Sequence, residues 1–229
     1  MRVIITIDGP TASGKSTVAA CIAKKLGFFH LNTGYLYRSL AYLLVTVRDY
    51  SEHALECVQQ DDIAECVRSD FFSYSYDAQK DVRIFYKDND ITTFLKDSSV
   101  DRYVALISSQ KVVREAMVEQ QRDLAKKYNL VIDGRDVGSL VFPQANFKFY
   151  LTASLPVRAA RWQKDQKVRG NVFTLEEAQA LVYDRDVKDM NREISPLAVP
   201  QGGIEIDNSD LTFDETVQKL LSYIIKPCC

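Results

Sequence analysis

The sequence predicts an α/β protein in which helices cover both faces of a parallel sheet. Three observations lead to this prediction. Short apolar, β-branched runs alternate with stretches of helical periodicity along most of the 229 residues, which is typical of parallel strands connected by helices. The first apolar run leads directly into a glycine-rich loop and a helix. Residues 51–110 break the alternation, which indicates an inserted unit.

The N-terminal elements follow from the spacing of apolar residues. Residues 3–7 form a short apolar run that stops at an Asp-Gly-Pro loop, as expected for a buried strand. Apolar residues then recur at helical spacing over residues 16–26, and Gly27 suits the C-cap of that helix. A second strand is expected over residues 28–31, and a second helix from residue 34 to about residue 48.

The inserted unit combines a helix with a small antiparallel sheet. A helical stretch is expected over residues 52–69. Aromatic residues and serines then alternate over residues 72–76, which is typical of a half-buried strand. Residues 82–86 are a second strand candidate, and residues 88–90 have the composition of a turn. We therefore predict an α+β insertion here.

Strands and helices alternate again in the remainder of the chain. The long helix there begins with Thr-Leu-Glu-Glu at residues 174–177, which is a capping-box pattern. The expected elements are a helix over 110–127, strands over 130–132 and 147–151, the long helix from 174 to about 192, a strand over 204–206 and a helix over 214–225.

Composition favours an ordinary globular protein. Hydrophobic residues make up 46% and charged residues 26%, with a net charge of -2, so a sizeable core is possible and a nucleic-acid-binding surface is not indicated. We expect a monomeric cytoplasmic protein without a signal peptide, a membrane span or a nucleic-acid partner. We also expect reduced thiols, because the cysteine count is odd and no C-x-x-C pair occurs. The cysteines are Cys21, Cys57, Cys66, Cys228 and Cys229.

Residues 9–16, GPTASGKS, match the phosphate-loop pattern G-x-x-x-x-G-K-[ST] in full. The glycines allow the backbone to approach phosphate closely. The N–H groups of the loop and the N-terminus of the following helix attract phosphate oxygens. In such a loop the lysine reaches the β- and γ-phosphates of ATP, and the serine hydroxyl ligates Mg²⁺. The expected ATP-binding residues are Gly9, Pro10, Thr11, Ala12, Ser13, Gly14, Lys15, Ser16 and Thr17.

Asp133 is the second expected Mg²⁺ ligand, together with Ser16. It ends the predicted strand over residues 130–132, where P-loop proteins place an acid that holds the metal ion. A simple strand-end turn is the alternative interpretation of this Asp-Gly pair. The predicted cofactor is therefore Mg²⁺, with ATP as the phosphoryl donor.

A phosphate loop occurs in GTPase switches, motor ATPases and small-molecule kinases. No N-K-x-D motif, with which GTPases recognise guanine, is found in the sequence. Motors are more often larger or carry partner-binding extensions. A kinase needs arginines elsewhere for its second anionic substrate, because a guanidinium group can donate two hydrogen bonds to one phosphate.

Suitable arginines occur away from the loop. Arg38 ends the segment TGYLYR, and Arg135 lies within DGRD. Arg185, Asp189 and Arg192 are spaced i, i+4 and i+7 on the long predicted helix and so share one face. An exposed, salt-bridged helix face is the alternative interpretation of the last three.

These motifs together resemble those of the bacterial cytidylate kinases, and the resemblance extends nearly from end to end. The segments that carry it, besides the phosphate loop, are TGYLYR at 33–38, VVRE at 112–115, DGRDVG at 133–138, VFP at 141–143, DMNR at 189–192 and SPL at 195–197. The resemblance implies the reaction (d)CMP + ATP = (d)CDP + ADP. A kinase of the same fold for UMP or a cofactor precursor is the alternative, and a nucleotide-binding switch module is a more distant one.

The resemblance also implies a division of the chain. A P-loop NTPase-type core would comprise residues 1–50, 111–157 and 171–229. An enlarged insert that binds the nucleoside monophosphate (NMP) would comprise residues 51–110, and a short lid would comprise residues 158–170.

Site residues are implied by the positions that match the motifs. Arg38, Arg135 and Arg192 would hold the phosphate of CMP, while Arg114 and Asp136 would recognise cytosine. UMP has a carbonyl where CMP has an amine, so a carboxylate at residue 136 would face a second acceptor and reject UMP. The remaining implied roles are pentose binding by Arg185 and Asp189, lining of the CMP pocket by Thr33 and Tyr37, and catalysis by Lys15, Arg135, Arg161 and Arg192.

Two positions depart from the family pattern. The family usually has a serine in the base pocket where this chain has Ala105, so Ser108 or Ser109 is the alternative source of that contact. In the lid, Trp162 follows Arg161 where paired arginines are usual. Lys164, Lys167 and Arg169 are the alternative sources of positive charge.

Overall fold

A five-stranded parallel sheet forms the centre of the computed structural model, which describes residues 2–68, 70–79 and 81–225. The strand order is β2-β6-β1-β7-β8, and every neighbouring pair is parallel. This confirms the predicted fold class. Cys228 and Cys229 lie outside the described residues. The strands are β1 (Ile4–Asp8), β2 (Phe29–Asn32), β6 (Leu130–Gly134), β7 (Phe147–Thr152) and β8 (Ile204–Asp207).

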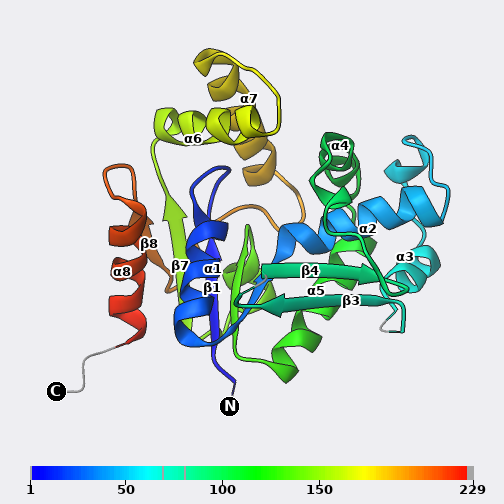
Figure 1. The fold of residues 1–229 in the computed structure, drawn as a ribbon, viewed down its shortest axis with the longest axis horizontal. Coiled ribbons are helices and arrows are strands. Elements are labelled where there is room, and N and C mark those ends of the chain that lie inside the picture. Colours follow the sequence, from blue (N-terminus) through cyan, green and yellow to red (C-terminus); the bar gives the residue numbers. More distant parts are fainter. Residues whose placement is uncertain (1, 69, 80, 226–229) are drawn as a thin grey trace.

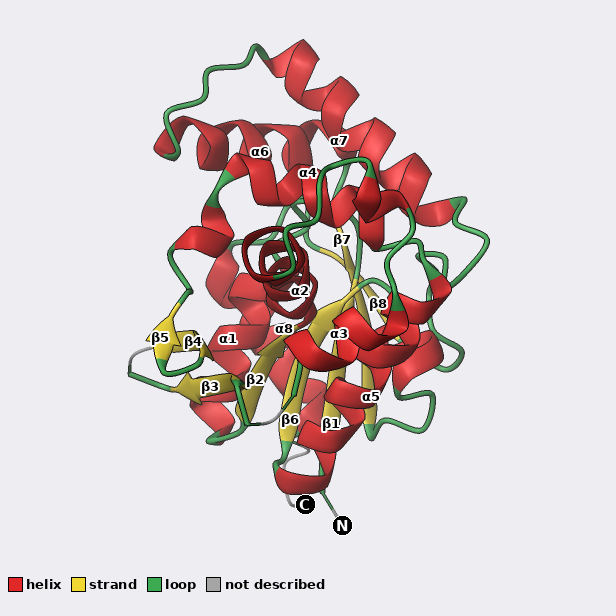
Figure 2. Cartoon of the chain, turned by 90° about the vertical axis from the view of Figure 1, so that its right-hand side faces the viewer, coloured by secondary structure: helices red, strands yellow, loops and turns green. Residues whose placement is uncertain are grey.

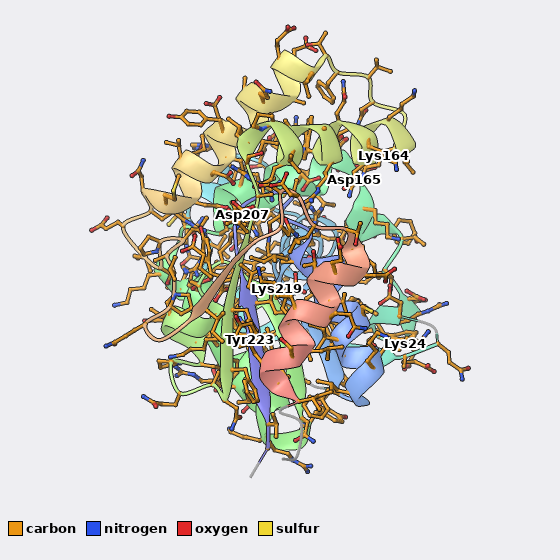
Figure 3. All side chains as sticks on the ribbon, turned by 90° about the vertical axis from the view of Figure 1, so that its left-hand side faces the viewer. Lys24, Lys164, Asp165, Asp207, Lys219 and Tyr223 are labelled. Atoms are coloured by element: carbon orange, nitrogen blue, oxygen red, sulfur yellow. The ribbon has the colours of Figure 1, made fainter. Side chains whose placement is uncertain are left out.

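Helices cover both faces of this sheet, as the alternation predicts. α1 (Lys15–Leu26) and α8 (Phe213–Ile224) pack on one face, and α2 (Thr33–Val47) and α5 (Lys111–Lys127) contribute to the core on the other. Figure 3 shows α8 with Tyr223 on the first face; the Tyr223 ring lies 6.2 Å from that of Phe149. Because both faces are covered, the central strands are continuous apolar runs rather than alternating ones.

Two long helices lie beyond the carboxyl ends of the strands. α6 (Leu155–Val168) and α7 (Leu175–Met190) pack against each other above the sheet (Figure 1). The predicted capping box at Thr174 is present. Asn191 is the C-cap of α7, so Arg192 lies beyond the helix. The expectation that Arg192 continues one helical face with Arg185 and Asp189 is therefore wrong, because the chain turns before it.

The insert contains the predicted antiparallel sheet. Its strands are β3 (Phe72–Asp77), β4 (Asp81–Tyr86) and β5 (Asn89–Asp90), and Figure 2 shows them beside β2. Tyr74 of β3 connects the two sheets, because its hydroxyl accepts a hydrogen bond from the backbone N–H of Asn32 at 2.9 Å.

The single helix predicted over residues 52–69 is wrong. In residues 52–68, which the structure describes, the helical elements are a 3-10 turn (Ala54–Glu56) and α3 (Gln60–Cys66). Gln110 explains the break: its side-chain amide donates to Leu55 O at 2.6 Å and accepts from Val58 N at 2.9 Å. These backbone groups are thus satisfied by a distant side chain instead of by a continuous helix.

The second half of the insert contains a helix that was not predicted from the sequence. A 3-10 turn (Phe94–Lys96) leads there into α4 (Ser98–Ile107), which buries Val100 and Ile107. In the described part of the chain, no helix combines the length and apolar character needed to cross a bilayer.

Candidate active site

The phosphate loop connects β1 to α1. At Gly9 a side chain is impossible, since a Cβ would lie 2.1 Å from the carbonyl oxygen of Leu151. Gly14 has φ +88° and caps α1 without a side-chain hydrogen bond, so the N–H groups of the first turn stay available to a ligand. This geometry suits anion binding at a helix N-terminus.

Lys15 is folded back against this loop. The residue is 7% exposed, and its ammonium group donates to the carbonyl oxygen of Pro10 at 2.9 Å. Burial, and then the nearby guanidinium of Arg135, lower the pKa of Lys15 well below its ordinary value. A nearby polyanion would favour the charged form of this amine, which suits a phosphate-binding role.

Asp133 is buried at the end of β6, beside the phosphate loop. The Ser16 hydroxyl and the Asn32 amide both donate to Oδ2, the latter at 3.3 Å. His30 Nε2 lies 2.8 Å from Oδ1. The carboxylate is therefore oriented by groups from α1 and β2. His30 and Asn32 were not predicted as site residues, because only the parallel pairing of β2 with β6 brings them to Asp133.

Ser16 and Asp133 offer two oxygen ligands for Mg²⁺. In the described part of the chain, no cluster of three or more His, Cys, Asp or Glu side chains could hold a metal ion. Mg²⁺ prefers oxygen ligands and usually keeps waters and substrate phosphates in its shell. The two side chains thus fit a Mg²⁺ ion that arrives with a nucleotide.

A cavity of about 590 Å³ opens beside the loop. Gly9, Pro10 and Ser13 do not line it. Arg38, Arg135 and Arg192 line this one cavity, although they come from distant parts of the chain. The predicted site residues in its wall are Thr11, Ala12, Gly14, Lys15, Ser16, Thr17, Thr33, Tyr37, Arg38, Arg114, Asp133, Arg135, Asp136, Arg161, Arg185, Asp189 and Arg192.

Asp189 holds two of these arginines. Its Oδ2 accepts from Arg135 Nε at 2.7 Å, and its Oδ1 lies 3.0 Å from Arg192 Nη2. Burial alone raises the pKa of Asp189, but Arg135 and Arg192 outweigh that effect and keep the pKa below its ordinary value. Asp189 therefore stays ionised and holds both guanidinium groups in the cavity wall. Arg185 is exposed in the cavity wall.

Arg114 and Asp136 form a buried ion pair in the cavity wall. Arg114 also donates to Ser108 O at 3.0 Å, and its guanidinium lies 5.8 Å from the ring centre of Tyr37. Burial raises the pKa of Tyr37 to about 12, so its hydroxyl stays protonated. Ser108 lines the cavity, whereas Ala105 is exposed and does not.

Arg38 makes contacts with the insert. It forms an ion pair with Asp101 of α4 and donates to Leu95 O at 3.1 Å. Asp101 also lies 3.7 Å from Arg169, which follows α6 and lines the cavity.

Thr33 donates its hydroxyl to Asp133 O at 2.9 Å. The start of α2 is thereby fixed to β6.

Arg161 contacts the phosphate loop rather than the acceptor arginines. It donates to Ser13 O at 3.4 Å and to Asn208 Oδ1 at 3.0 Å. Trp162 packs on Phe173, with ring centres 5.0 Å apart. Lys164 and Lys167 are exposed and do not line the cavity; Figure 3 shows Lys164 on the outer part of α6.

Asp8 is a further buried carboxyl that the sequence analysis did not single out. It accepts from Val137 N at 2.9 Å and Gly138 N at 2.7 Å. Burial raises the pKa of Asp8 to about 7, against the effect of these two donors. Because Asp8 immediately precedes the phosphate loop and Asp136 precedes Val137, this carboxyl ties the loop to the segment with Asp136.

Comparison with known proteins shows to which family the chain belongs. The family model for cytidylate kinase matches residues 5–226. The cytidylate kinase of Caldanaerobacter subterraneus subsp. tengcongensis is 37% identical, over 99% of this chain and 96% of that protein. The cytidylate kinase of Bacillus cereus is 34% identical, over 97% of this chain and 96% of that protein.

A solved structure shows a related fold. It is an uncharacterized protein from Eubacterium ventriosum, with a TM-score of 0.56, 12% identity, and coverage of 97% of this chain and 98% of that one. At this identity the likeness concerns the fold alone. The family model and the two related kinases show that the chain belongs to the cytidylate kinase family.

Proposed function

We propose that this protein transfers the γ-phosphoryl group of ATP to CMP and dCMP and releases ADP and CDP or dCDP. One observation carries the proposal. Most of the phosphate loop, three arginines and the buried Arg114–Asp136 pair line a single cavity. That arrangement offers a place for each part of two nucleotides, and family membership supports it.

The residues of the chain would act by positioning and by charge stabilisation. The acceptor is already a phosphate oxyanion, so transfer needs little proton abstraction. Lys15 would hold the β- and γ-phosphates of ATP, and Arg38, Arg135 and Arg192 would hold the phosphate of CMP. Mg²⁺, held with the help of Ser16 and Asp133, would supply further neutralisation of the phosphate charge. Bringing two anions together in a water-poor site makes this neutralisation essential.

Acceptor choice would depend on the buried ion pair. Asp136 would accept from the exocyclic amine of cytosine while Arg114 donates to a ring acceptor. Uracil would place a carbonyl against the carboxylate and leave two acceptors unpaired, which such a site rejects. Arg185 and Asp189 would contact the pentose. The structure places Ser108, not Ala105, in the wall of the cavity, so we assign to Ser108 any serine contact with the base.

We further propose that residues 51–110 and 158–170 close over the bound nucleotides. The ion pairs of Asp101 support this proposal, because Arg38 connects α4 of the insert to α2 and Arg169 connects it to the end of α6. Closure would exclude water and limit ATP hydrolysis. Action as a cytoplasmic monomer remains a prediction.

A coupled assay of ADP formation against a panel of nucleoside monophosphates tests the function. We expect CMP and dCMP to be the preferred acceptors and UMP, AMP and GMP to be poor ones. Lys15→Ala should lower kcat by at least about a hundredfold, since the main contact with the transferred group is lost. A preference for another acceptor, or near-wild-type activity of the Lys15 variant, would contradict the proposal.

A further inference from the structure

Thr11 of the phosphate loop is held on both sides of its backbone by one buried ion pair. Its N–H donates to Asp186 Oδ1 at 2.8 Å, and its carbonyl oxygen accepts from Arg158 Nη1 at 3.1 Å. Arg158 and Asp186 are also paired with each other. The pair thus satisfies both main-chain groups of a residue that is only 5% exposed.

The two partners come from the helices above the sheet. Arg158 is in the first turns of α6 and also donates from Nε to Ala153 O at 2.8 Å. Asp186 is on α7. Their exposed fractions are 9% and 4%. Neither residue lines the cavity, so neither has a direct contact with a nucleotide bound there.

We propose that Arg158 and Asp186 are positioning residues for the donor site: they hold the phosphate loop in the shape that binds ATP. The proposal rests on the proposed function. The residue after Thr11, Ala12, has φ +59°, a left-handed conformation that is unfavourable for a side chain with a Cβ. A loop with such a residue needs outside contacts to keep its shape.

Stability alone does not account for this pair. Replacement of a buried ion pair by apolar residues of similar volume is often neutral or stabilising. The polar atoms of this pair, in contrast, form hydrogen bonds with the backbone of Thr11. Its replacement leaves the Thr11 N–H and carbonyl oxygen without partners, so the loop should change shape while the rest of the fold stays intact. Weaker ATP binding by a folded variant therefore separates a positioning role from a structural one.

The same helix also reaches the acceptor side. Asp189 is one turn after Asp186 on α7 and binds Arg135, which in turn donates to the Thr11 hydroxyl at 3.3 Å. Both carboxylates therefore act on Thr11. Asp186 contacts it directly, and Asp189 holds Arg135, which contacts the Thr11 hydroxyl. Loss of the first contact should affect ATP more than CMP, because the second contact remains.

The double variant Arg158→Met/Asp186→Leu tests the proposal in the full chain. Isothermal titration with MgATP and with CMP gives the two dissociation constants, and urea unfolding gives the stability. We expect the Kd for MgATP to rise about tenfold or more and the Kd for CMP to change less than threefold. In assays, KM for ATP should rise more than KM for CMP.

A matched control replaces an ion pair that does not touch the loop. Arg48 and Asp62 form a partly buried pair outside the cavity, and the variant Arg48→Met/Asp62→Leu should leave both dissociation constants unchanged. Unaltered MgATP binding by the folded Arg158/Asp186 double variant would overturn the proposal. Equal losses of ATP and CMP binding would also contradict it, since they indicate general damage to the site.

A second variant covers the case in which the double variant does not fold. Arg158→Lys keeps a cation near Asp186 but lacks the planar guanidinium group. That group contacts Asp186 and the Thr11 carbonyl through Nη1, and the Ala153 carbonyl fixes its orientation through Nε. We expect this variant to be folded and to bind MgATP at least fivefold more weakly; wild-type affinity would refute the positioning role. Because MgATP binding is measured directly, the result does not depend on CMP being the acceptor.

Discussion

Arg114 and Asp136 are joined in an ion pair whose side chains are only 5% and 11% exposed. A carboxylate paired with an arginine can only accept hydrogen bonds at the base site. Asp136→Asn keeps the shape of the side chain but adds a donor, which can pair with the carbonyl of uracil. We expect the ratio of kcat/KM for CMP to that for UMP to fall by about 10- to 100-fold.

The measurement is kcat/KM for both acceptors at saturating MgATP. Stability should be followed in parallel, because the variant alters a buried ion pair. An unchanged ratio would remove Asp136 from base recognition.

Arg38 gives a second prediction, on the affinity for the acceptor. Arg38→Ala removes a guanidinium group from the cavity wall, so KM for CMP should rise about tenfold or more while KM for ATP changes little. Arg48→Ala is the matched control, since Arg48 follows the same helix, α2, but pairs with surface residues Asp62 and Glu65. Steady-state kinetics of the two variants gives KM for CMP and KM for ATP. Similar KM values for CMP in both would mean that Arg38 does not hold the phosphate.

Asp133 leads to a prediction on the metal ion. Asp133→Asn removes a charged oxygen ligand but keeps the side-chain size, so the Mg²⁺ concentration for half-maximal activity should rise about tenfold or more. Binding of Mn²⁺ together with ATP, followed by electron paramagnetic resonance, gives a readout that does not need turnover. Asp123→Asn, on the exposed face of α5, serves as the control. Wild-type Mn²⁺ affinity of the Asp133 variant would rule out this ligand.

Asp8 makes the stability of the protein depend on pH. Its pKa is raised from 3.8 to about 7 in the folded state, chiefly by burial. The folded state therefore binds the proton more tightly than the unfolded state. The resulting stabilisation is complete below pH 4 and is lost as the pH rises to about 7; it amounts to on the order of 4 kcal/mol.

Asp8→Asn isolates this effect, because the amide does not titrate. The stability of the wild type relative to this variant should be greatest below about pH 4, should decrease as the pH rises to about 7, and should then level off. Urea unfolding, followed through the fluorescence of the single tryptophan, Trp162, measures the difference. A difference that stays constant would show that Asp8 titrates in its ordinary range, and one that grows with pH would show that the fold lowers its pKa.

Local patterns were sufficient for most of the fold. The predicted strands of the central sheet, the antiparallel pair in the insert and the Thr174 capping box are all present. They depend on apolar periodicity and on capping residues close in sequence. The predicted helix over residues 52–69 failed for the opposite reason: Gln110, more than forty residues further along the chain, satisfies the backbone at the break.

The amino-acid sequence by itself determined the alternating α/β plan, the phosphate loop with Lys15 and Ser16, and the arginines that could serve an acceptor, since these follow from short motifs. Only the tertiary structure decided that Asp186 and Arg158 hold Thr11, that His30 meets Asp133, and that Arg38 lies beside Asp101. These contacts join segments that are distant in sequence. Their positions are set by strand order and helix packing, which no local pattern encodes.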